Sequence, residues 1–305
     1  MSAIPSPAVR KLGVIFTTAQ ALRAGISRRQ LAGAGYRQLI RGSYWKVGSA
    51  PSLVQQVRYL LGALPAARFA SHHTAATLWG AVAPMTSDIH LGTRKRRQSP
   101  HRGVRLHFFT HPPEVLTVNG IALTSPRQTF LDLAAHLELV DLLVLGDSLV
   151  RRARMVPAEL AEFLADKHTA GAGKAREVAA LVRCTVDSAN ESRLRLLMVS
   201  AGLPEPVVNH VVRIGGRRRK LDMSYPKLML AFEFDGRHHI ERERQWEADI
   251  LRREEVEAIG WRFIIITSTA MYAEPLAVLK RIVDAVQLAS GVRLRISDGW
   301  RRHFG

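Results

Sequence analysis

The chain has 305 residues, enough for two or three domains, and 47% of them are hydrophobic, so it can bury sizeable cores. It carries 44 Lys and Arg against 26 Asp and Glu, which gives a net charge of +18. Such a charge favours a polyanionic partner, with nucleic acid as the first candidate and an anionic membrane surface as the second. The alternative is a compositional bias with no specific partner. The single cysteine, Cys184, excludes an internal disulfide and a four-thiolate zinc site, and fits a reducing cytoplasm.

No stretch of the sequence predicts a membrane span or a signal peptide. The N-terminal segment MSAIPSPAVRKLGVIF has no long apolar core after its charges. The most apolar run, LELVDLLVLGDSLV, is interrupted by Asp141 and Asp147. We therefore expect a soluble, cytoplasmic protein with no membrane partner.

The first region, residues 1–50, has the pattern of a winged helix-turn-helix. Thr17 or Thr18 offers an N-cap for a helix that stops at Gly25, and Ser27 caps a second helix over RRQLAGAGY. The segment RQLIRGSYWKVG then places strand-like residues on both sides of an RGS turn. This order of helix, tight turn, helix and two-stranded ribbon predicts a DNA-binding module.

Five basic side chains of this region are candidate DNA contacts. Arg28 and Arg29 open the second helix, where a recognition helix faces the major groove. Arg37, Arg41 and Lys46 fall on the expected wing, placed for phosphates. The alternative is a small helical packing module with solvated arginines.

The second region, residues 51–175, predicts a mixed α/β domain. Helices are expected over PSLVQQVRYLLGAL, over ASHHTAATLWG and after Pro126, and strands over DIHLGT and VRLHFFT. The loop between these strands, RKRRQSPHRG, is either a phosphate-contacting patch or a solvated turn. His72 and His73 point about 100° apart on a helix, so they are a poor metal pair and we expect them to be structural or exposed.

The third region, residues 176–290, predicts a helix, three strands, a helix, a strand and a helix, which is a mixed α/β sandwich. A basic tail, residues 291–305, follows. The stretch LMLAFEFDGRHH is a strand that ends in charged residues. Strand alternation puts Glu233 and Asp235 on one face and Phe232 and Phe234 on the other.

A bend at Pro226 makes the two preceding strands an antiparallel hairpin, so Asp222 lies about level with residues 231–233 and can face the same side as Glu233. Converging carboxylates repel one another unless a cation lies between them. A hard divalent ion with oxygen ligands, Mg²⁺ or Mn²⁺, suits such a set, and zinc suits it less because no thiolate is present.

The same set of residues suits phosphodiester hydrolysis, because a bound metal polarises a phosphoryl oxygen and activates water. Basic residues flank the acids on both sides, and His238 can act as general acid or base. The flanking residues are Arg217, Arg218, Arg219, Lys220 and Arg237. The alternative is that the acids form salt bridges with neighbouring arginines at a strand end.

This third region resembles the PD-(D/E)XK nuclease superfamily, in particular domains related to very-short-patch mismatch-repair endonucleases, in NESRLRLLMVSAGLP, KLDMSYPKLMLAFEFDGRHH, ADILRREEVEAIGW and FIIIT. The resemblance implies a restriction-endonuclease-like αβββαβα fold. It implies Asp222 and Glu233 as the metal-binding pair and Glu191 as the helix acid. Asp235 takes the place of the lysine that positions the attacking water, with a nearby histidine as substitute. Asp249 and Arg252 match a helix Asp-x-x-Arg pattern, structural or DNA-facing.

The first two regions resemble the AbiEi-type antitoxins of type IV toxin–antitoxin systems, in GVIFTTAQALRAGISRRQL, LIRGSYW, SHHTAATLWG and TSPRQTFLDLA. That resemblance implies promoter binding, repression of the protein's own operon, and a cognate toxin or defence partner.

Together the patterns predict an α/β (α+β overall) DNA-binding protein with a Mg²⁺-dependent endonuclease-like domain that hydrolyses DNA, in phage defence or DNA repair. The alternatives are a non-catalytic transcriptional regulator or antitoxin, and an enzyme that acts on RNA.

Overall fold

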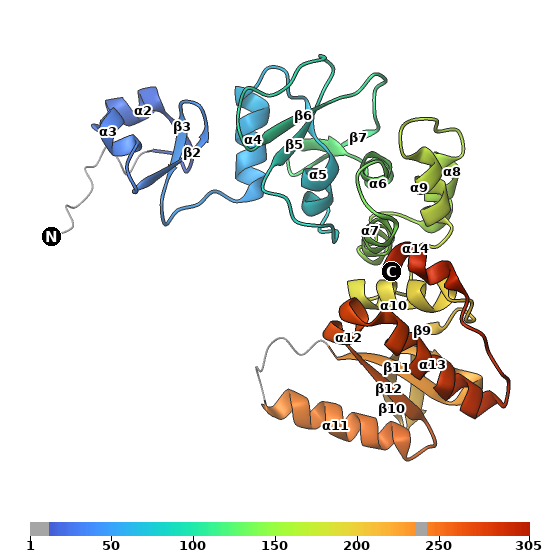
Figure 1. Cartoon of the computed structure of the whole chain (residues 1–305). Helices are drawn as coiled ribbons and strands as arrows, with labels where there is room; N and C mark the ends of the chain where they lie inside the picture. The colour runs from blue at the N-terminus through green and yellow to red at the C-terminus, as the bar shows by residue number, and fades with distance from the viewer. Residues whose placement is uncertain (1–11, 236–242) are drawn as a thin grey trace. The chain divides into compact units, whose positions relative to one another are not determined.

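The computed structural model of the chain describes residues 12–235 and 243–305, and it is a mixed α/β structure with three sheets (Figure 1). The chain forms two compact units. The first comprises Met1–His136 and Asp166–Ala175, and the second comprises Leu137–Ala165 and Arg176–Gly305. The predicted α/β class is therefore confirmed. The named domain folds stay predictions, as do the proposed domain boundaries.

The N-terminal module of the first unit begins with two capped helices. Thr17 and Ser27 are their N-caps, and each forms a capping box with the glutamine three residues later. The hydroxyl accepts one backbone N–H and the glutamine accepts the other, so local sequence alone defines both helix starts. The elements are β1 (Phe16–Thr17), α2 (Thr18–Arg23), α3 (Arg28–Leu31), β2 (Tyr36–Ile40) and β3 (Ser43–Lys46), with sheet order β1-β3-β2.

The second helix of this module is shorter than RRQLAGAGY predicts. It ends at Leu31, and the Gly33-Ala34-Gly35 segment forms a turn before β2. Glycine loses more conformational entropy in a helix than other residues do, so the two glycines disfavour continuation of α3 beyond Leu31. Leu31 packs with Phe16, Ala21 and Ile26 in a small core.

The rest of the first unit is built on a five-stranded sheet with order β6-β5-β4-β8-β7. The two expected strands, β5 and β6, are present and run parallel. The expected helix α5 follows β4, and α6 starts at Pro126 with Ser125 as its cap. The elements are α4 (Leu53–Ala63), β4 (Phe69–Ala70), α5 (His72–Leu78), β5 (Ile89–Thr93), β6 (Val104–Phe108), β7 (Val115–Val118), β8 (Ile121–Thr124) and α6 (Pro126–Ala134).

The second unit contains a four-stranded sheet with order β12-β11-β10-β9, antiparallel except for the parallel pair β11 and β12. The predicted order of helix, three strands, helix, strand and helix is confirmed, with one short helix added after β12. These elements are α10 (Ala189–Ser200), β9 (Val207–Ile214), β10 (Arg217–Tyr225), β11 (Leu230–Asp235), α11 (Glu243–Glu257), β12 (Arg262–Thr267), α12 (Ser268–Ala273) and α13 (Pro275–Ser290).

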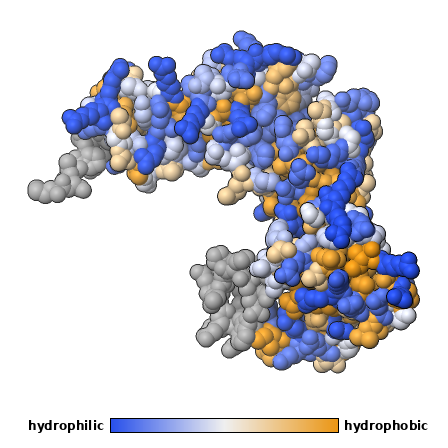
Figure 2. Space-filling view, in the orientation of Figure 1, coloured by the Kyte–Doolittle hydropathy of each residue, from blue (hydrophilic) through white to orange (hydrophobic). Residues whose placement is uncertain are grey.

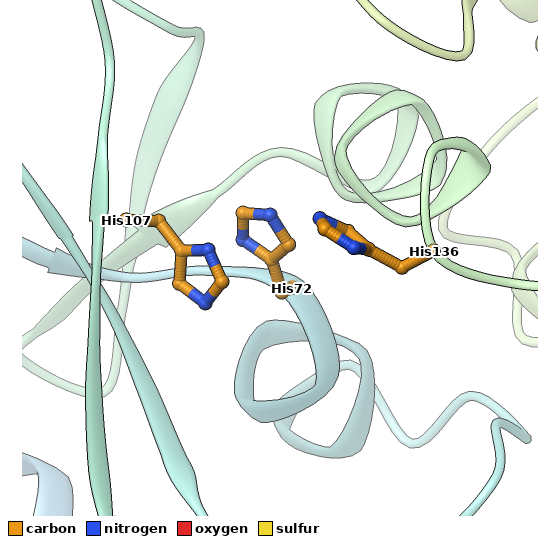
Figure 3. A group of neighbouring side chains, drawn as sticks. All are labelled: His72, His107 and His136. Carbon is orange, nitrogen blue, oxygen red and sulfur yellow. The ribbon is translucent and has the colours of Figure 1, made fainter.

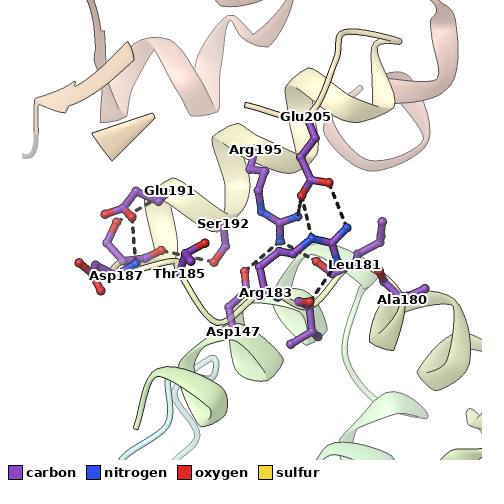
Figure 4. A network of polar contacts seen from close by, with 12 residues as sticks. Asp147, Ala180, Leu181, Arg183, Thr185, Asp187, Glu191, Ser192, Arg195 and Glu205 are labelled. Atoms are coloured by element: carbon purple, nitrogen blue, oxygen red, sulfur yellow. Dashed lines mark hydrogen bonds and ion pairs between the residues drawn. The ribbon is translucent and has the colours of Figure 1, made fainter. Parts of the chain in front are cut away.

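Helix α7 (Leu139–Arg151) belongs to the second unit, where a buried ion pair joins it to α10 (Figure 4). The side chain of Arg195 is 2% exposed, and its Nη2 donates to Asp147 Oδ2 at 3.1 Å and to the Leu181 carbonyl at 2.7 Å. Its Nη1 donates to Glu205, which also pairs with Arg183. A buried guanidinium needs such partners, so these residues hold the two helices together.

The expected basic tail packs on the core of the second unit. Trp300 is 3% exposed within that core, and the Ser297 N–H donates to the Ala201 carbonyl at 3.0 Å. The remaining helices are α8 (Pro157–Leu164), α9 (Ala172–Ala179) and α14 (Arg301–Phe304). None of the helices in residues 12–235 and 243–305 combines the length and apolarity needed to cross a bilayer.

Candidate functional site

Three acids of the second unit converge on its sheet: Glu191 in the first turn of α10, Asp222 on β10 and Glu233 on β11. Met223 pairs with Phe232 in the antiparallel register, so Asp222 and Glu233 are the next pair across the two strands. Such neighbours share a face of the sheet. The predicted level of Asp222 is thus confirmed. Phe232 lies in the core on the opposite face, and Phe234 packs against it, also as predicted.

These carboxyl groups are poorly solvated. Glu191 and Glu233 are each 5% exposed, and Asp222 is half-buried. Burial raises the pKa of all three, and the charge of Asp222 raises the pKa of Glu191 and Glu233 further. These three carboxyl groups therefore need a positively charged partner at this point of the sheet.

Arg252 of α11 supplies part of this positive charge. Its Nη1 and Nη2 donate to Glu233 Oε1 and Oε2 at 2.8 and 2.9 Å, a bidentate pair. Asp222 Oδ2 accepts the Phe234 N–H at 3.2 Å. Within the Asp-x-x-Arg pattern, Arg252 thus has a structural partner in the described part of the chain.

Glu191 also has a structural role. Its Oε2 accepts the Asp187 N–H at 2.9 Å, while Ser188 Oγ accepts the Glu191 N–H at 3.1 Å. The acid and the serine together cap the start of α10. Lys220 pairs with Asp187, which brings a cation close to this group.

The donor chemistry fits Mg²⁺ or Mn²⁺, which would be held by Asp222 and Glu233. Both Glu233 oxygens are engaged by Arg252, so metal binding requires Glu233 to exchange this partner. In residues 12–235 and 243–305, these acids do not form a set of three whose ligand atoms all lie within 4.8 Å of one another. The site is therefore an acid pair with a cation beside it.

Several predicted residues of this site are not placed. Arg237 and His238 lie outside the described residues. Asp235 ends β11, where its backbone pairs with Thr267, and its side chain is likewise outside what the structure describes. The predicted roles of these three residues stay predictions.

The basic run at the start of β10 is largely paired. Arg217 and Arg219 both contact Glu255 of α11, and Lys220 contacts Asp187. Arg218 is exposed and forms no ion pair with any acid that the structure describes. Arg218 is thus the residue of this run with its charge most available to a phosphate.

The five basic residues of the N-terminal module are different. All are exposed, and none forms an ion pair with an acid in the described ranges. Arg28 of α3 and Arg41 of the β2–β3 turn line one pocket together with Gln38 and Tyr44. Figure 2 shows long hydrophilic side chains projecting from this module. The full set is Arg28, Arg29, Arg37, Arg41 and Lys46.

Comparisons with known proteins leave the activity open. No family model matches the chain. It is 26% identical over 211 residues to "Uncharacterized protein MT2308" of Mycobacterium tuberculosis strain CDC 1551 / Oshkosh, and equally to "Uncharacterized protein Rv2248" of strain H37Rv. Each match covers 68% of this chain and 78% of the relative.

A histidine cluster in the first unit was missed by the sequence interpretation. His72, His107 and His136 bring one ligand nitrogen each to within 4.8 Å of one another (Figure 3). The sequence directed attention to the adjacent His72 and His73, of which only His72 joins this set. His107 and His136 are isolated histidines in a strand and after a helix, and no spacing rule connects them.

Proposed function

We propose that this chain is a DNA-binding protein whose second unit carries a divalent-metal-dependent site for phosphodiester hydrolysis. The observation that carries the proposal is the position of Asp222 beside Glu233 on adjacent strands, with Glu191 buried nearby and the pKa of each raised by burial. Perturbed carboxyl groups grouped in this way are typical of functional sites. The resemblance to PD-(D/E)XK nucleases supports the same residues.

Asp222 and Glu233 would hold Mg²⁺ or Mn²⁺, which supplies Lewis-acid polarisation of the phosphoryl group and an activated water when bound. Release of Arg252 from Glu233 would accompany metal binding and leave the guanidinium beside the site. Arg218, which is exposed, would bind a phosphate of the substrate.

Binding of DNA would rest mainly on the N-terminal module. Its five exposed basic side chains and the net charge of +18 suit a polyanion, and the two helices with a hairpin wing suit a duplex groove. Phosphate contacts of this kind make binding strongly dependent on salt.

A second candidate is a non-catalytic transcriptional regulator or antitoxin that acts with a cognate toxin. The bidentate Arg252–Glu233 pair favours it, because this pair neutralises one of the two proposed ligands without a metal. Asp235 at the position where the nuclease superfamily has a lysine favours it as well. The acids would then stabilise the fold.

The test is a cleavage assay with Mg²⁺ or Mn²⁺ on duplex, mismatched and single-stranded DNA and on RNA. We expect metal-dependent DNA cleavage that Asp222→Asn and Glu233→Gln abolish. Glu255→Gln is the matched control, because Glu255 pairs with Arg217 and Arg219 outside the acid pair. Absence of cleavage together with absence of Mn²⁺ binding by calorimetry would refute the enzyme, and retained DNA binding would then support the regulator. Cleavage restricted to RNA would show the third alternative.

A further inference from the structure

The histidine cluster of the first unit gathers ligands from three separate elements. His72 begins α5, His107 lies on β6, and His136 follows α6. Figure 3 shows the three imidazoles projecting toward one another from these elements. His72 is buried, His107 is half-buried and His136 is exposed, so the cluster reaches the surface at His136.

One ring nitrogen of His72 and one of His107 are within hydrogen-bonding distance of a neighbouring side chain. His72 Nδ1 lies 3.0 Å from Ser71 Oγ, and His107 Nε2 lies 2.9 Å from His90 Nδ1. His72 Nε2 and His107 Nδ1 are the nitrogens left for a ligand. A metal-binding histidine usually directs its other N–H to a polar partner, which fixes the tautomer. Ser71 and His90 are suitable partners for that purpose.

The imidazoles of His72 and His107 pack against each other. Burial lowers the pKa of His72 well below its usual value, and it lowers the pKa of His107 to about 3, with the neighbouring imidazoles adding to both effects. The rings of His72 and His107 stack with centroids 3.6 Å apart and planes 19° apart. Two imidazolium ions would repel strongly at this distance.

The backbone at His72 is unusual. Its φ is +50°, in the left-handed region that non-glycine residues rarely adopt. Such a conformation is strained and persists where the surroundings impose it, often at functional sites. Here it occurs at the most buried member of the cluster.

We propose that His72, His107 and His136 bind one divalent transition-metal ion of the zinc class, with a fourth coordination position open beside His136. Three nitrogen ligands with no carboxylate suit Zn²⁺, Ni²⁺ or Cu²⁺ and do not suit Mg²⁺. Because the rings of His72 and His107 stack, metal binding requires a turn about χ2 that brings their lone pairs together and shifts their hydrogen bonds to Ser71 and His90.

A three-ligand site of this kind leaves room for water or an external ligand. It would also link β6 to the helices α5 and α6. This site goes beyond the proposed nuclease function, because it uses other residues, another unit and another class of metal than Asp222 and Glu233.

The test uses the untagged full-length protein, stripped of metal with a chelator. Co²⁺ serves as a spectroscopic probe, followed by competition with Zn²⁺ and by calorimetry. We expect one equivalent of Zn²⁺ per chain, visible absorption typical of low-coordinate Co²⁺, and a higher melting temperature in the presence of Zn²⁺. His107→Ala and His136→Ala should each lower the Zn²⁺ affinity by at least about 100-fold.

His136→Ala is the more informative variant, because His136 is exposed and its loss should leave the fold intact in circular dichroism. His111→Ala is the matched control, an exposed histidine of the same unit outside the cluster. The proposal is overturned if the wild type binds neither Zn²⁺ nor Co²⁺. Equal losses in His111→Ala and His136→Ala would also overturn it, as would binding that depends on Asp222 instead. Asp222→Asn therefore separates this site from the nuclease site.

Discussion

The acid cluster of the second unit and the histidine cluster of the first unit both bury ionisable side chains, and each avoids unpaired charge in its own way. Glu233 is paired with Arg252 through both carboxylate oxygens. His72 and His107 are instead neutral, because burial lowers the pKa of each. Glu233 is therefore paired with a cation of the chain itself, whereas the histidines keep nitrogen lone pairs available.

The physical reason is the position of the ordinary pKa relative to neutral pH. An imidazole titrates near 6.5, so modest burial removes its charge at little cost. A carboxyl titrates near 4, and moderate burial leaves it charged at pH 7, where it requires a counterion. A metal at the acids must compete with Arg252, whereas a metal at the histidines has no cation to displace among the described contacts.

The largest expected effect comes from removing the internal cation. Arg252→Met should destabilise the protein by about 3 kcal/mol in urea unfolding, because it removes the bidentate partner of buried Glu233 and leaves the longer contact to Arg253 at 3.9 Å. Combining it with Glu233→Gln should recover much of this loss. Addition of Mn²⁺ should stabilise the single variant if Glu233 is a metal ligand. A double variant as unstable as the sum of its parts would contradict the pairing.

Asp132 of α6 is a carboxyl whose hydrogen-bond partners are neutral. Gln128 Nε2 donates to its Oδ1 at 2.8 Å, its Oδ2 is buried without a partner, and burial raises its pKa to about 7. The native state thus keeps a proton that the unfolded state loses above pH 4, so stability should fall between pH 4 and pH 7.

Asp132→Asn should abolish this pH dependence and raise stability at pH 8 by about 2 kcal/mol, a value reduced for the partial exposure of the residue. Urea unfolding at pH 5 and pH 8 measures it. Asp166→Asn, a change at an exposed acid of the same unit, should leave the fall in stability between pH 4 and pH 7 as it is, because the hydrogen bond from Lys167 lowers the pKa of Asp166 and confines its effect to lower pH. An unchanged profile in Asp132→Asn would show that this carboxyl is ionised in the native state.

His90 supports the proposed zinc site without joining it, because its Nδ1 contacts His107 Nε2. His90→Phe keeps an aromatic ring and removes this contact, so the Zn²⁺ affinity should fall about tenfold, measured by competition with Co²⁺. A loss as large as that of His107→Ala would instead make His90 a ligand.

The smallest expected effect concerns exposed and paired arginines. Arg41→Ala in the N-terminal module should lower the slope of log affinity against log salt for DNA by about one, measured by fluorescence anisotropy. Arg219→Ala should change this slope less, because Glu255 already neutralises Arg219. Equal changes in the slope would indicate that β10 and the wing both contact the bound DNA.

Local sequence signals predicted the secondary structure well where a single side chain decides it. Thr17 and Ser27 cap their helices as expected, because a hydroxyl accepts a backbone N–H only a few residues away. The bend at Pro226 likewise aligned Asp222 with Glu233, since a hairpin relates residues by simple counting. The error at Leu31, where α3 ends early, occurred where helix propensity is marginal.

The sequence by itself therefore determined the order of the main elements in residues 176–290, the starts of α2 and α3, and the acid pair on β10 and β11. It did not indicate β1, β4, β7 or β8. Only the tertiary structure decided that Arg252 occupies Glu233, that Trp300 packs in the core, and that three distant histidines meet. The physical reason is the distance along the chain over which each interaction acts. Caps and hairpins depend on neighbours along the chain, whereas ion pairs and metal ligands depend on which surfaces pack together. That packing depends on the balance of many weak contacts.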